Sequence, residues 1–246
     1  VMGLATGAML KLVKVSFDFA METDKIYSEF RKTTGAGTEF NQVIKDVEGS
    51  GRIAGVTLKE TAQAVGALKN TFTDFTYYSV EVQKEIASTT TILAEIGFSA
   101  QNQAEIWQTA TQAMGMSMRG AQSLMLDITS TARSLGIDVD KLGASFIKNQ
   151  EILVRYGSRA GIVFQEMAVQ AKALGVDTDT LLGLMDRFKQ FDTAGEAVGR
   201  LNAILGGPYL NSIDMLNASL EDPIEGIKML KGAFDEAGIS ADALSG

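Results

Sequence analysis

Paired aspartates are the residues in this chain that come closest to a metal-binding pattern. Asp138 and Asp140 resemble the start of a calcium loop, in which alternating side-chain oxygens coordinate the ion. The pattern then fails, because Leu142 stands at the fifth position and Asn149 at the twelfth, where a bidentate glutamate is needed. The segment that begins at Asp177 fails in the same way. We therefore expect helix capping here and no metal-ligating residues.

The side chains that most often do catalytic chemistry are missing or not singled out. The 246 residues include no cysteine and no histidine, which excludes thiol nucleophiles, Cys-based zinc sites and a Ser-His-Asp triad built from this chain alone. No phosphate-binding G-x-x-x-x-G-K loop occurs. Several glutamates could in principle supply an acid–base pair, but nothing in their spacing singles out two of them, and solvated helix faces explain them. They are Glu81, Glu85, Glu95, Glu105, Glu151 and Glu166. We expect no catalytic residues, no cofactor and no enzymatic activity.

Composition favours a globular protein without a nucleic-acid site. Hydrophobic residues make up 46% and charged residues 21% of the chain, which is typical of a folded domain. The 22 basic and 30 acidic residues give a net charge of −8, whereas binding to phosphates is supplied by Lys and Arg. The only prolines are Pro208 and Pro223, so long stretches are free of helix breakers.

The most informative pattern is a glycine followed by an apolar residue and then by Ser, Thr or Asp. We interpret each instance as a junction between helices, because glycine ends a helix in the left-handed conformation and the third residue caps the next helix. The six structural turn glycines are Gly55, Gly97, Gly115, Gly136, Gly175 and Gly238. Thr57 to Glu60 and Thr193 to Glu196 also fit capping boxes, and Asp222 before Pro223 fits a helix start.

The stretches between these junctions read as helices. Apolar residues such as Leu124, Ile128 and Leu135 recur at helical spacing, and no segment shows convincing period-two alternation. Glycine spacings near multiples of about twenty predict helices of about 14 to 17 residues, within the ordinary range. The predicted fold is all-α, an array of short helices in helix-turn-helix units.

A longer amphipathic or coiled-coil-like helix is expected to precede that array. Its apolar residues alternate in steps of three and four, weakened by Ser16 and Thr23, and form a candidate self-association seam. The seam residues are Met9, Leu12, Phe19, Ile26 and Phe30. The alternative is one amphipathic helix that packs on its own domain. Lys11 and Lys14 argue against a membrane span, but contact of this helix with a membrane surface stays open.

Glycine clusters suggest two domains. Gly35-Ala36-Gly37 and Gly49-Ser50-Gly51 punctuate the chain around a short helix and predict a flexible joint. We expect residues 1–50 to hold the long helix, the short helix and this joint, and residues 51–246 to form a compact multi-helix domain. Because the sequence opens on Val1-Met2-Gly3, we expect it to be a piece of a longer polypeptide.

Two of the predicted turns are nearly copies of each other. Ala132–Leu142 and Ala171–Leu181 share the pattern A-[RK]-x-L-G-[IV]-D-x-D-x-L, which predicts repeated helical hairpins. This turn resembles a motif of phage tail tape-measure proteins, and the opening seam resembles the helical rod of that family. The resemblance is best from about Phe98 to Met185.

The resemblance implies a structural virion component: a fragment of a protein that sets tail-tube length during assembly and leaves the tube at infection. It implies a homo-oligomer, trimeric or hexameric, with tail-tube proteins and the tail-tip hub as partners. The implied location is the tail interior of the virion, and the host cytoplasm during assembly. The alternative from the residues alone is a generic helical scaffold or adaptor domain that binds a partner protein.

Overall fold

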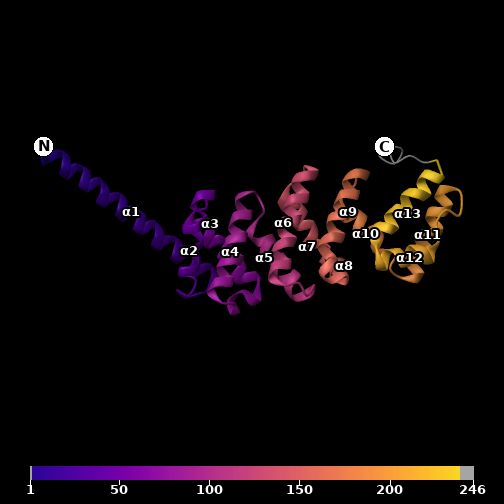
Figure 1. The fold of residues 1–246 in the computed structure, drawn as a ribbon, viewed down its shortest axis with the longest axis horizontal. Coiled ribbons are helices and arrows are strands. Elements are labelled where there is room, and N and C mark those ends of the chain that lie inside the picture. The colour runs from indigo at the N-terminus through magenta and orange to yellow at the C-terminus, as the bar shows by residue number, and fades with distance from the viewer. Residues whose placement is uncertain (1, 239–246) are drawn as a thin grey trace. The chain divides into compact units, whose positions relative to one another are not determined.

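The described part of the protein is built of helices. The computed structural model describes residues 2–238, with side chains from residue 14 onward, and within these bounds no strand is present. Figure 1 shows the succession of helices, joined mostly by short turns. The predicted all-α fold class is therefore confirmed, including a long first helix.

The chain divides into two compact units, Val1–Gln108 and Thr109–Gly246. The sequence suggested a boundary near residue 50 instead. The division lies later because the short helix that follows the first glycine cluster packs closely on two helices beyond it.

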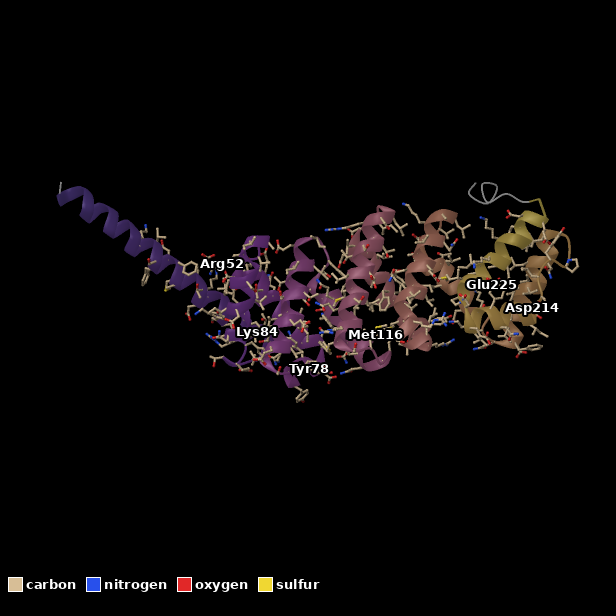
Figure 2. The ribbon with its side chains drawn as sticks, viewed as in Figure 1. Arg52, Tyr78, Lys84, Met116, Asp214 and Glu225 are labelled. Atoms are coloured by element: carbon tan, nitrogen blue, oxygen red, sulfur yellow. The ribbon has the colours of Figure 1, made fainter. Side chains whose placement is uncertain are left out.

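Unit 1 is a bundle around one central helix. Helix α3 packs against α1, α2, α4 and α5, while α2 also packs on α4. Lys84 on α4, labelled in Figure 2, pairs with Asp46 on α2 at 2.5 Å. The elements are α1 (Met2–Thr34), α2 (Asn41–Gly51), η1 (Arg52–Ala54), α3 (Leu58–Thr71), η2 (Thr73–Tyr77), α4 (Val80–Glu95) and α5 (Ala100–Gln108).

Aromatic side chains fill the core of unit 1. Phe72 stacks on Trp107 with ring centroids 6.3 Å apart, and Phe40 stacks on Phe75 at 5.8 Å. All four are buried, which is the usual way for aromatic area to stabilise a core. Tyr77, two residues after Phe75, is instead 86% exposed.

Unit 2 contains the remaining helices. Helix α6 packs on α7 and α9, and α9 packs on α10. The last three helices pack in succession, and α13 also contacts α9 and α10. The elements are η3 (Thr109–Ala113), α6 (Met118–Leu135), α7 (Val139–Lys148), α8 (Gln150–Leu153), η4 (Val154–Arg159), α9 (Ala160–Leu174), α10 (Thr178–Asp186), α11 (Phe191–Leu205), α12 (Ser212–Glu221) and α13 (Pro223–Glu236).

Helix lengths are less uniform than the glycine spacing predicted. Helices α5 and α10 have 9 residues and α7 has 10, whereas α6 has 18. Some of the residues expected in α-helices instead form the more tightly wound 3₁₀ segment η4 and the more widely wound π-helical segment η3. Within η4, Gly157 has φ 53° and ψ −128°, a conformation that the six-turn pattern did not anticipate.

The second glycine cluster is helical rather than a joint. Gly49, Ser50 and Gly51 form the end of α2. Gly51 is buried, and a Cβ there would lie 2.9 Å from the Cβ of Val56. The absence of a side chain therefore permits a close approach in the core, which is a different use of glycine from chain flexibility.

One predicted capping box is present and one is wrong. The Thr57 hydroxyl accepts from the Glu60 N–H, and the Glu60 carboxylate accepts from the Thr57 N–H at 2.9 Å. Thr193 instead lies inside α11, which begins at Phe191, and its hydroxyl donates to the Gln190 carbonyl. The helix starts earlier than the box required, after an N-cap residue without a side-chain cap bond.

Candidate functional site

The six glycines selected from the sequence all have positive φ. The values are 89° at Gly55, 93° at Gly97, 66° at Gly115, 63° at Gly136, 70° at Gly175 and 72° at Gly238. No non-glycine residue in the described part of the chain has a positive φ. The residues that complete the last junction, Ile239 and Ser240, lie outside the described residues.

The two copied turns have the same backbone. After α6, the Ile137 N–H donates to the Ala132 carbonyl at 2.8 Å; after α9, the Val176 N–H donates to the Ala171 carbonyl at 3.0 Å. The Gly136 N–H donates to the Arg133 carbonyl and the Gly175 N–H donates to the Lys172 carbonyl, each at 3.3 Å. This is the bonding of a Schellman helix end.

After the glycine, the two copies differ. Asp138 caps α7, because its carboxylate accepts from the Lys141 N–H at 2.9 Å. Asp177 occupies the same place before α10, but its side chain makes no cap bond, so the capping prediction is wrong there. The sequence repeat continues into the next helix, but the structural likeness extends only to the helix end and not to the cap of the next helix.

Asp179 joins α10 to α7 instead. Its carboxylate accepts from Lys148 Nζ at 2.6 Å, from Asn149 Nδ2 at 2.9 Å and from the Ser145 hydroxyl. Burial raises the pKa of the Asp179 carboxyl, but the bonds from Lys148 and Ser145 outweigh it, and the pKa lies below its usual value. The carboxylate is thus held charged as a structural tie.

A cleft of 560 Å³ lies beside this tie, between α7, α9 and α10. Lys141, Lys148 and Lys172 line it together with Asp177 and Asp179. Its mixed charge suits a polar or charged protein surface better than an apolar small molecule.

The seam residues of α1 are divided between two environments. Phe30 is 4% exposed and lies edge-on to Phe40 at 6.1 Å, so it belongs to the core of unit 1. Ile26 lines a groove with Phe30 against α3, in which Gly66 allows close approach. At Phe30 the helix therefore packs on its own domain, which was the alternative to self-association. For Met9 and Leu12, the structure describes the helical backbone only.

The earlier part of the same helix face is uncovered. Phe19 precedes Ile26 by two turns and so lies on the same side of α1, yet it is 65% exposed. Val15, one turn before Phe19, is 66% exposed, and every residue from 14 to 22 is exposed. In Figure 1 the indigo helix α1 extends past the other helices of unit 1.

Two of these features were missed from the sequence. Val15 could have been added to the seam, because it precedes Phe19 by four residues. Asp179 carried no usable signal, since only the packing of α10 on α7 brings its carboxylate to Ser145 and Asn149.

Two other kinds of site are absent from the described residues. No helix there is both long and apolar enough to cross a membrane. Across the same residues, no group of three or more acidic side chains could hold a metal ion.

Comparison with known proteins gives no match. No protein-family model matches the sequence, and neither a curated protein nor a solved structure matches the chain.

Proposed function

We propose that this chain is a structural virion component, a helical segment of a phage tail tape-measure protein. In this role it would act in self-assembly inside the tail and would contact tail-tube and tail-tip hub proteins. It would set length rather than catalyse a reaction.

The observation that carries the proposal is the uncovered apolar face of α1. That face continues from Ile26 and Phe30, which α3 covers, to Val15 and Phe19, which nothing in the described part of unit 1 covers. Burying one such aromatic side chain contributes about 1.5–3 kcal/mol, so an exposed row favours association. Side chains at heptad spacing are suited to packing with a parallel or antiparallel copy.

A second support is the reiterated turn. The shared backbone at Gly136 and Gly175 fits the helix-turn-helix units that the family resemblance implies. Helical hairpins of this kind fill space with local packing and need few special side chains.

Self-association can be tested with a matched pair of variants. Phe19 and Phe17 are almost equally exposed, at 65% and 64%, but lie two residues apart on different sides of α1. Phe19→Glu should weaken the oligomer at least about tenfold in dissociation constant, measured by sedimentation equilibrium. Phe17→Glu should have a much smaller effect because its side chain lies off the seam.

The adaptor function remains the second candidate because of the cleft in unit 2. Binding of a partner there needs no self-association, and Lys141→Glu with Lys172→Glu should weaken it by reversing two charges that line the cleft. A monomeric wild-type chain, with no effect of Phe19→Glu, would contradict self-assembly and favour the adaptor.

A further inference from the structure

The last three helices of unit 2 form a separate group, here called the C-terminal arm (residues 191–236). Helix α11 packs on α12 and α12 on α13, while α13 provides the main packing of the arm on α9 and α10. Residues 187–190 connect α10 to the arm in a non-helical turn. The arm is therefore held to the rest of unit 2 through a limited set of side chains.

One docking contact is a close approach at a glycine. Gly226 is buried on α13, and a Cβ at this position would collide with the terminal methyl group of Met185 on α10. Met185 is itself buried. The Met185 side chain on α10 thus occupies the space that a side chain at position 226 of α13 would fill.

A second contact is one hydrogen bond between segments far apart in sequence. The Tyr156 hydroxyl on η4 donates to the Ser219 carbonyl on α12 at 3.0 Å. Ser219 is fully buried, and its own hydroxyl has no hydrogen-bond partner. An unpartnered buried hydroxyl reduces the stability of the docked arm, because water would satisfy it on release.

The connecting turn carries a more destabilising feature, the buried ammonium group of Lys189. Its side chain is 3% exposed, and Nζ has no hydrogen-bond partner. The nearest carboxylate oxygen, Asp186 Oδ1, lies 3.4 Å away and is also 3.4 Å from Arg155. The Tyr156 ring, 5.2 Å from Nζ, adds a cation–π contact. Burial lowers the pKa of the Lys189 ammonium below its usual value, and the nearby Asp186 carboxylate offsets this effect only in part.

We propose that the C-terminal arm is a releasable module that opens about the turn at residues 187–190, with buried Lys189 keeping its docked state only marginally favoured. Opening hydrates the Lys189 ammonium and the Ser219 hydroxyl, and this hydration offsets part of the cost of exposing Met185 to water. This inference does not depend on the proposed role in a virion.

Hydrogen exchange of the full chain, measured by mass spectrometry, tests the proposal by whether exchange in the arm becomes slower or faster. Lys189→Met keeps the length of the side chain and removes the charge. It should slow exchange in α11–α13 about tenfold or more while leaving α6 unchanged. Lys228→Met is the control, because Lys228 lies on α13 with its side chain 66% exposed and should change little.

Faster or unchanged exchange in the arm of Lys189→Met would overturn the proposal. The charge of Lys189 would then stabilise the docked arm or have no effect on its stability. An equal slowing in α6 would overturn it too, because the effect would be global.

A second variant opens the arm from the other side. Gly226→Leu places a branched side chain against Met185 and should speed exchange throughout α11–α13 about tenfold or more, with α6 still protected. Parallel loss of protection in α6 would show that the arm does not open alone. Unchanged exchange in the arm would contradict the docking contact.

Discussion

Gly136 and Gly175 end α6 and α9 with positive φ in open surroundings. No heavy atom lies within 4 Å of the place where a Cβ would be at either position. The cost of a side chain there is therefore conformational and does not include a steric clash with neighbours. At Gly51 the opposite holds, because φ is ordinary and Val56 occupies the space.

Gly136→Val and Gly175→Val should each lower the free energy of unfolding by about 1–2 kcal/mol, because a β-branched residue resists the left-handed region. Urea denaturation followed by circular dichroism measures the loss. Gly195→Ala, inside α11 with no neighbour within 4 Å, is the control and should raise stability by about 1 kcal/mol. Unchanged stability in both valine variants would contradict the turn geometry.

The buried hydroxyl of Tyr156 should make the folded protein less stable in alkaline solution. Burial raises the pKa of its hydroxyl from 10.0 to about 12. Between these values the folded state keeps the proton and the unfolded state has lost it, so stability falls as pH rises through this window. Tyr156→Phe should make the fall shallower by roughly 1–2 kcal/mol, measured by urea unfolding at several pH values. An identical slope in the variant and the parent would refute the assigned environment.

At the scale of elements, helix ends were more predictable than helix starts. A helix end is set by a local event, the left-handed glycine, so the sequence signals it directly. A helix start leaves its first four N–H groups without intrahelical acceptors, and an N-cap side chain is only one of the partners that can satisfy them. Thr193 and Asp177 both looked like caps, yet α11 begins earlier and α10 begins without a side-chain cap.

The contrast between the two copied turns can be measured. Asp138→Ala removes a cap from α7 and should cost about 1 kcal/mol. Asp177→Ala removes no cap bond and should cost less than half as much. Chemical denaturation of both variants under the same conditions gives the comparison. Equal losses would mean that Asp177 caps α10 in solution.

Pairings between distant segments were not accessible from the sequence. Asp179 meets Ser145, and Tyr156 meets Ser219, only because of how the helices of unit 2 pack. The burial of Lys189 has no signal in the sequence either, since a single charge beside Phe188 does not indicate it. The heptad seam was visible, but the point at which α3 begins to cover it was not.

At the scale of the whole molecule, the chain consists of two compact units, divided between Gln108 and Thr109. Periodicity predicted their all-α character, but the glycine clusters suggested a boundary much earlier. The cluster at Gly49–Gly51 serves core packing of α2, which is why it did not mark the division.

Two compact units should respond separately to a local defect. Gly136→Val lies in unit 2 and should speed hydrogen exchange there while leaving α3 and α5 of unit 1 unchanged. Equal loss of protection in both units would show that they fold as one cooperative body.

The central proposal is that this chain sets the length of a phage tail, and a measurement of tail length tests it most directly. Duplicating residues 2–29 inside α1 adds four heptads and keeps the seam in register. In a virus that encodes this chain, electron microscopy of purified particles should show tails longer by about 42 Å, at 1.5 Å per helical residue. Tails of unchanged length on particles that contain the duplicated chain would contradict the proposed role as a tape measure.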